Sequence, residues 1–231
     1  MNEIQQEIQS NIKRIIDGIP QGVRLVAVSK YNSNDRIEAA YSAGQRLFGE
    51  SRAQELVPKA QALPKDIRWH FIGHLQTNKV KYIVPYVSCI ESVDSFRLLS
   101  EINKQAQKIN RVIPCLLQFH VAIEETKFGF DLDECEQMLL SNDYKEFCNV
   151  SIIGVMGMAS ITTDTDYIRK EFRHVKQIYT KLKAGFFAND DKFSEISMGM
   201  THDYKIAIEE GSTIVRVGSG ILGERMYINH S

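Results

Sequence analysis

The sequence predicts a single (β/α)8 barrel, the TIM-barrel class of α/β fold, with an extra N-terminal helix. Eight short apolar runs alternate with segments of helical period along the 231 residues. Several of these runs lack polar alternation, which is typical of parallel strands covered on both faces. No stretch rich in glycine, proline and serine divides the chain, so residues 1–231 are expected to form one domain. An open, doubly wound sheet is the alternative, because the number of strands does not establish closure.

Eight segments are predicted as strands because they are short, apolar and rich in β-branched or aromatic residues. In chain order they are residues 25–30 (LVAVSK), 46–50 (RLFGE), 68–73 (RWHFIG), 88–93 (SCIESV), 113–121 (IPCLLQFHV), 151–158 (SIIGVMGM), 195–199 (EISMG) and 212–218 (STIVRVG).

Helices are predicted between the strands by apolar residues that recur on one face. The extra helix is indicated by a stripe of isoleucines at positions 4, 8, 12, 15 and 16, and Pro20 is expected to end it. Asp94 or Ser95 is placed to cap the helix that contains residues 98–106. Gly185 and Gly211 are expected to end the helices that precede the last two strands.

Composition excludes several classes of protein. Hydrophobic residues make up 43% and charged residues 25%, and the formal net charge is −1, so neither nucleic acid nor a membrane surface is an expected partner. The four cysteines show no CxxC spacing and are expected to be reduced and buried, without a metal. The N-terminus lacks the apolar core of a secretory signal. A cytoplasmic protein is therefore expected.

The loops after the seventh and eighth predicted strands combine glycine with hydroxyl side chains. In barrels of this class the active site lies at the C-terminal ends of the strands, and phosphate groups often bind at these two loops. Ser197, Met198 and Gly199 form the first loop, and Gly218 and Ser219 begin the second. Glycine lets backbone N–H groups approach an anion, although the same residues also suit tight turns. The following helix is expected to begin at residues 201–203.

Lys30 ends the first apolar run, so its amine is expected at the barrel mouth. A desolvated lysine near other cations has a lowered pKa and attacks carbonyl groups. The alternative is a surface lysine that merely follows a strand. A carbonyl-reactive lysine opposite a phosphate site fits an aldehyde and a phosphate in one ligand, which describes pyridoxal 5′-phosphate (PLP).

Arg216 lies two residues before Gly218, so strand alternation places both on the same side. Arg216 is expected deeper in the barrel, within reach of a pyridine nitrogen. An arginine there cannot accept a proton and disfavours protonation of the nitrogen. The alternative is an ion pair inside the barrel, with Glu50 or Glu91. Met156 is expected to floor the mouth as soft packing.

Two histidines bracket the third predicted strand, His70 and His74. Strand geometry does not provide the helical HExxH arrangement of a zinc site, so His70 is expected to pack or hydrogen-bond. Asn78 and Lys79 follow at the start of the next helix.

These segments together resemble the PLP homeostasis protein family, which shares its fold with the barrel domain of alanine racemase. The resemblance covers nearly the whole chain and is carried by AVSKYNSNDRIEAAYSAGQRLFGESRAQE, WHFIGHLQTNK, EETKFGF, GVMGMAS and ISMGMTHDYKIAIEEGSTIVRVGSGILGE. It implies a fold-type III PLP barrel with Lys30 as the Schiff-base lysine. The implied phosphate contacts are Ser197, the backbone around Met198, Gly218 and Ser219, and Arg216 is implied near the pyridine nitrogen.

Two residues depart from the family pattern. Ser51 stands where members usually carry Asn after FGE, so a polar contact to the edge of the cofactor is expected to be shorter or water-mediated. His120 stands where they often carry Asn.

The resemblance implies a PLP carrier with little or no turnover. Racemase catalysis needs a second base from a separate β-domain, for which this chain is expected to be too short. A fold-type III PLP enzyme such as a racemase is the alternative, with the base supplied by Tyr31, His202 or a partner subunit. An aldolase-like barrel, in which Lys30 captures a phosphorylated carbonyl substrate, is a third. The expected ligand is PLP and the expected protein partners are PLP-dependent apo-enzymes, with the chain a monomer or weak homo-oligomer.

Overall fold

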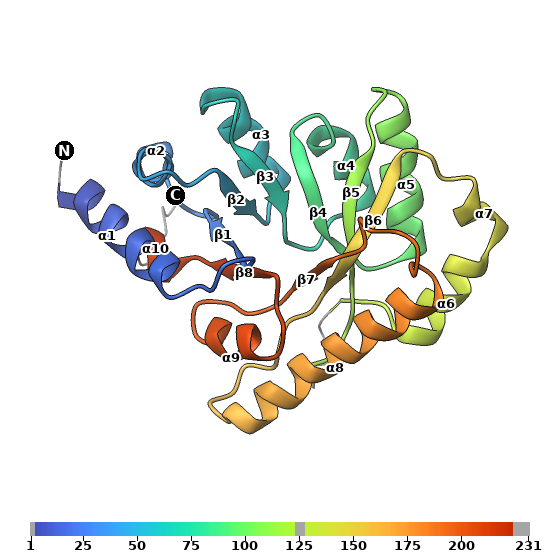
Figure 1. The fold of residues 1–231 in the computed structure, drawn as a ribbon. Coiled ribbons are helices and arrows are strands. Elements are labelled where there is room, and N and C mark those ends of the chain that lie inside the picture. Colours follow the sequence, from blue (N-terminus) through green and yellow to red (C-terminus); the bar gives the residue numbers. More distant parts are fainter. Residues whose placement is uncertain (1–2, 123–127, 224–231) are drawn as a thin grey trace.

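Eight parallel strands form a closed barrel with helices on the outside (Figure 1), in a computed structural model that describes residues 3–122 and 128–223. Strand β1 pairs with β2 on one side and with β8 on the other. This closure confirms the predicted (β/α)8 barrel and excludes the open doubly wound sheet.

All eight predicted strands are present. They are β1 (Arg24–Val28), β2 (Leu47–Glu50), β3 (Arg68–Phe71), β4 (Val87–Val93), β5 (Ile113–Gln118), β6 (Val150–Met156), β7 (Glu195–Ser197) and β8 (Ile214–Val217).

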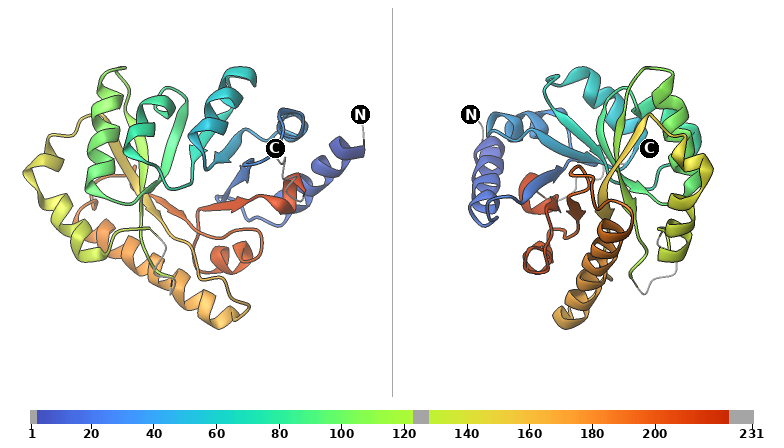
Figure 2. Two further views of the ribbon diagram at one scale, coloured as in Figure 1. Left: turned by 180° about the vertical axis from the view of Figure 1, so that it is seen from behind. Right: turned by 45° about the vertical axis from the view of Figure 1, so that its right-hand side comes forward.

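The described helices include the extra N-terminal helix. They are α1 (Glu3–Asp17), α2 (Asn34–Ser42), α3 (Ala53–Ala62), α4 (Thr77–Ile83), α5 (Phe96–Gln107), α6 (Leu132–Leu140), α7 (Asn142–Lys145), α8 (Thr165–Gly185), α9 (Tyr204–Glu209) and α10 (Ser219–Leu222). Both views in Figure 2 place α1 at one side of the barrel, near α2 and α10.

Several predicted boundaries need correction. Strand β1 ends at Val28, so Lys30 lies in the following turn and not at the end of the strand. Helix α1 ends at Asp17, before Pro20. Helix α9 begins at Tyr204 and not at residues 201–203, because the Asp203 carboxylate first accepts the Met200 N–H in a turn. The predicted cap of α5 is confirmed: the Ser95 hydroxyl accepts the Leu98 N–H at 3.3 Å.

The barrel is filled by two stacked layers of side chains. The first is apolar and contains Val26, Leu47, Cys89, Leu116, Met156 and Ile214. Glu91 and Arg216 lie two positions further along β4 and β8 and so point to the same side as this layer. With Ser197 at the end of β7, to which both are bonded, they form a polar layer nearer the C-terminal end. The larger core lies between the outer faces of the strands and the helices. No helix in the described ranges is long and apolar enough to cross a membrane.

Candidate functional site

The polar layer beneath the barrel mouth is a hydrogen-bonded network centred on Glu91. Its Oε1 lies 2.5 Å from His70 Nδ1, and its Oε2 accepts from the Ser197 hydroxyl at 2.6 Å. Arg216 Nη1 lies 3.7 Å from the same Oε2 and donates to Ser197 Oγ at 2.5 Å. Arg216 Nη2 donates to the Gly157 carbonyl at 3.1 Å. Four strands therefore contribute to one buried constellation, β3, β4, β7 and β8.

This network keeps two charges in the barrel interior. Burial by itself would raise the pKa of Glu91, but hydrogen bonding and charge from His70, with Arg216 and Ser197, hold it below the ordinary value. Burial lowers the pKa of Arg216, and the Glu91 charge opposes this. Arg216 makes the ion pair with Glu91 that the sequence offered as an alternative, and it also lies where a contact to a ligand in the mouth was expected. His70 hydrogen-bonds, as predicted, and the described residues contain no metal-binding cluster.

Ser197 and Met198 lie differently from the expected phosphate contacts. The Ser197 side chain is fully buried and its hydroxyl donates to Glu91, so a phosphate contact requires this hydroxyl to turn away. The Met198 N–H donates to the Ile214 carbonyl at 3.1 Å, and its side chain belongs to the outer core. The sheet thus uses the N–H of Met198 itself, whereas the N–H of the next residue, Gly199, is not used by the sheet. The contact of Ser197 with phosphate stays a prediction.

Three neighbouring N–H groups remain available in the two loops. Among the described residues, the backbone N–H groups of Gly199, Ser219 and Gly220 have no hydrogen-bond partner. A fourth, that of Gly218, donates to Thr201 Oγ1 at 3.3 Å, which ties the two loops together. Unpaired N–H groups at the top of a barrel suit an anion.

Position 199 requires glycine for two reasons, its backbone conformation and the lack of space for a side chain. Its φ is +92°, and a Cβ there would lie 2.5 Å from the Ala207 Cβ. Its carbonyl accepts the Arg216 N–H at 2.9 Å. Only glycine therefore fits between the loop and α9.

Lys30 lies in a turn that is bound on both sides. The following residue, Tyr31, has a φ of 63°, a left-handed conformation that costs a non-glycine residue about 1 kcal/mol. The Tyr31 N–H donates to Glu55 Oε2 at 2.7 Å, and the Lys59 ammonium donates to the Ser29 carbonyl at 2.9 Å. The residues before and after Lys30 are therefore held by two side chains of α3.

Glu50 completes this cluster behind the turn. Its Oε1 accepts from the Ser29 hydroxyl at 2.6 Å and from Lys59 Nζ at 2.7 Å, while Lys59 also donates to Glu55 Oε2 at 3.1 Å. Glu50 is fully buried, and its Oε2 has no hydrogen-bond partner in the part of the chain that the structure describes. Burial raises the pKa of Glu50, and the nearby Lys59 charge opposes this. We call Glu50, Glu55 and Lys59 the Lys30 clamp.

The remaining predicted residues lie around these groups. Met156 is fully buried in the apolar layer, which agrees with packing and leaves it no exposed surface. Ser51 lines a pocket of about 200 Å³ beside the mouth, together with His74 and Lys79. His120 follows β5 and His202 precedes α9, and both are exposed. Part of the EETKFGF segment, residues 124–127, and Glu224 in GILGE lie outside the described residues.

The sequence did not reveal the Lys30 clamp. Its one local signal was the i,i+4 spacing of Glu55 and Lys59 on a helix, which many solvated helices share. Their contact with the Lys30 turn depends on how α3 packs against β1.

Curated relatives match over most of the chain. The "Pyridoxal phosphate homeostasis protein" of Aquifex aeolicus is 37% identical over 206 residues, covering 88% of this chain and 88% of the relative. The protein of the same name from Synechocystis is 36% identical and covers 92% and 96%. This chain belongs to the pyridoxal phosphate homeostasis protein family. The family model "Alanine racemase, N-terminal domain" also matches residues 5–226.

Solved structures agree with this membership of the PLP homeostasis family. PipY from Synechococcus elongatus, crystallised with PLP bound, is 30% identical with a TM-score of 0.84, over 94% of this chain and 100% of that one. The alanine racemase of Bartonella henselae, with covalently bound pyridoxal phosphate, is 14% identical with a TM-score of 0.70, over 95% of this chain and 60% of that one. The latter similarity shows a shared fold.

Proposed function

We propose that this chain binds PLP at the C-terminal mouth of the barrel and holds it as a Schiff base on Lys30. The single observation that carries the proposal is the arrangement of three elements at one mouth. Lys30 follows β1, unpaired N–H groups follow β7 and β8, and Arg216 lies below them in β8. PipY, whose whole chain is covered by the match, was crystallised with PLP bound.

The residues present fit this cofactor. The N–H groups of Gly199, Ser219 and Gly220 would hold the phosphate, with the Ser219 hydroxyl beside them. Arg216 would face the pyridine nitrogen and, having no lone pair to accept a proton, would keep that nitrogen unprotonated. Lys30 would condense with the aldehyde and release water. Ser51 is a further proposed contact at the edge of the mouth, and Met156, which has no exposed surface of its own, is proposed to support the floor of the mouth from below.

We propose in addition that the chain is a cofactor carrier with little or no turnover of its own. When bound, PLP supplies electron withdrawal through its pyridine ring, and an unprotonated nitrogen weakens this effect. Arg216 is held in place by Glu91 and Gly157. Because an arginine fixed beside the pyridine nitrogen keeps that nitrogen unprotonated, this arrangement favours storage of the cofactor over catalysis. The relatives are named as homeostasis proteins. Cytoplasmic PLP-dependent apo-enzymes are the proposed recipients, and the proposed unit is a single barrel domain, as a monomer or weak homo-oligomer.

Exchange of the α-proton of amino acids distinguishes a carrier from a racemase. PLP-loaded protein is incubated in deuterated water with a panel of L- and D-amino acids, and deuterium incorporation is followed by NMR. A positioned acid–base group contributes about 10²–10⁴ in rate, so a carrier without one is expected to show exchange that is absent or very slow. Exchange at about 1 s⁻¹ or faster, in the ordinary enzyme range, would overturn the carrier proposal and support the racemase alternative. His202, Tyr31 and His120 would then be mutated first.

A further inference from the structure

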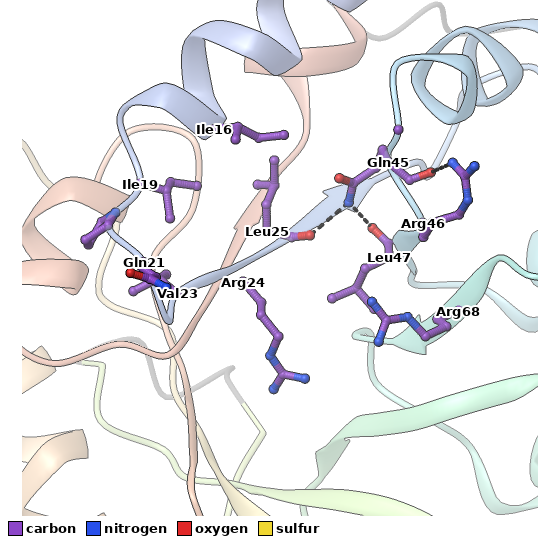
Figure 3. A pocket seen from close by; sticks show the side chains of 12 residues that line it. Ile16, Ile19, Gln21, Val23, Arg24, Leu25, Gln45, Arg46, Leu47 and Arg68 are labelled. Atoms are coloured by element: carbon purple, nitrogen blue, oxygen red, sulfur yellow. Dashed lines mark hydrogen bonds between the residues drawn. The ribbon is translucent and has the colours of Figure 1, made fainter.

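A second cavity lies at the opposite end of the barrel from Lys30. It has a volume of about 430 Å³, which is within the range of small-molecule sites. It lies between the segment that follows α1 and the first residues of β1, β2 and β3 (Figure 3). It is therefore separated from the proposed PLP site by the whole packed interior of the barrel.

The lining of this cavity carries three arginines and no carboxylate, Arg24, Arg46 and Arg68. Two of them are neutralised by acids from outside it. Arg24 Nη2 lies 2.6 Å from Glu195 Oε2, and Arg46 Nε lies 2.8 Å from Asp66 Oδ2. Arg68 is exposed, and its guanidinium has no acidic partner in the described ranges. The cavity thus keeps an uncompensated positive charge in a chain whose net charge is −1.

The arginines differ in direction. Figure 3 shows Arg24 and Arg68 on the same side of the cavity, below Leu25 and Leu47, whereas Arg46 extends away toward the Gln45 carbonyl. The Gln45 amide donates to the Leu25 and Leu47 carbonyls and so fixes the part of the cavity lining that these two residues form. Arg68 is therefore the uncompensated cation that a ligand would meet, and Arg24, which is paired with Glu195, lies on the same side.

Much of the remaining lining is apolar. It includes Ile16, Ile19, Val23, Leu25 and Leu47, and Ile16 is 47% exposed. An apolar surface beside an uncompensated guanidinium suits a ligand with an apolar body and an anionic end, because each part then leaves water for a matching surface.

We propose that this cavity binds a small organic anion, a phosphate or carboxylate on an apolar body. Arg68 contacts the charged group, and Ile16, Ile19 and Val23 contact the body. The site is independent of PLP binding at the mouth and is filled while PLP is bound.

The test uses PLP-loaded protein, so that the mouth is already filled. Phenyl phosphate, benzoate and inorganic phosphate are titrated by isothermal calorimetry, and NMR maps the residues that respond. Phenyl phosphate or benzoate is expected to bind at one site and more tightly than inorganic phosphate. Arg68→Gln is expected to weaken binding about tenfold through loss of a charge-assisted hydrogen bond. Because Arg68 is exposed, this variant is expected to fold normally.

Arg173→Gln is the matched control. Arg173 is an exposed arginine on α8 that pairs with Glu210 at 2.9 Å and does not line the cavity. It is expected to leave binding unchanged. The proposal is overturned if neither organic anion binds at millimolar concentration, if inorganic phosphate binds equally well, or if Arg68→Gln and Arg173→Gln behave alike.

Discussion

At the residue scale, Lys30 is positioned by groups that are distant from it in sequence. Its neighbours Ser29 and Tyr31 are bound by the Lys30 clamp on α3 and β2. Lys30 and Arg216 could be predicted from sequence because each lies at a fixed place on or just beyond an apolar strand. The clamp could not, because its contacts depend on helix packing and on a left-handed turn at Tyr31 that no local residue pattern specifies.

The clamp is tested by Glu55→Gln, which weakens the acceptor of the Tyr31 N–H. Loss of a charge-assisted bond at this exposed turn is expected to cost about 1 kcal/mol, which is about fivefold in the equilibrium constant of imine formation on Lys30. The total amount of bound PLP is expected to change little, because the phosphate contacts remain. Absorption spectroscopy measures the imine, and equilibrium dialysis measures total PLP. Glu38→Gln, an exposed carboxylate on α2, is the control, and equal imine loss in both variants would contradict a positioning role.

Glu91 gives a second residue-scale prediction, of stability against pH. Because the pKa of Glu91 is lowered in the folded protein, its stabilisation is full above the ordinary carboxyl pKa and is lost as pH falls through the folded value. Glu91→Gln leaves Arg216 without its charge partner, so the free energy of unfolding at pH 7 is expected to fall by about 3 kcal/mol. The difference in the free energy of unfolding between Glu91→Gln and the unaltered protein should become smaller in acid. Urea denaturation at pH 7 and at several pH values below 4.5, the ordinary carboxyl pKa, measures this difference. A difference that stays constant below pH 4.5 would contradict the assignment.

At the scale of elements, the strands were predictable and their C-terminal ends were not. The predicted segment 195–199 continues past β7, which ends at Ser197. There the chain remains apolar while Gly199, with its φ of +92°, turns it out of the sheet. The sequence thus identified the two loops, but it did not distinguish which N–H group near Met198 is left outside the sheet. Register alone decides that the Met198 N–H joins the sheet and the Gly199 N–H does not.

The loop after β8 is tested through Ser219, whose hydroxyl and N–H both lie beside the proposed phosphate. Ser219→Ala removes only the hydroxyl and is expected to weaken PLP binding about tenfold. Pyridoxal, which lacks the phosphate, is expected to bind more weakly to the unaltered protein than PLP binds to the variant. Fluorescence titration measures both. Ser194→Ala, which alters an exposed serine just before β7, is the control. Equal affinities for pyridoxal and PLP would refute the phosphate site.

At the scale of the whole molecule, closure of the barrel brings together residues from opposite ends of the sequence. Pairing of β1 with β8 places Val26 beside Arg216, so Lys30 shares one mouth with the loops after β7 and β8. Eight alternating units predicted this arrangement, since a parallel barrel of this length has one C-terminal face. The cavity at the other face was not predicted, because Arg24 and Arg68 belong to different strands and have no common motif.

Lys30 is the proposed site of the covalent bond to PLP. Reduction of the PLP-loaded protein with borohydride fixes a pyridoxyl group on the reacting amine, and proteolysis with mass spectrometry locates it. We expect one modified peptide, which contains Lys30. In Lys30→Ala, we expect both the imine absorption and the modification to be lost while the fold is retained. A pyridoxyl group on Lys59, Lys79 or another lysine in place of Lys30 would contradict it.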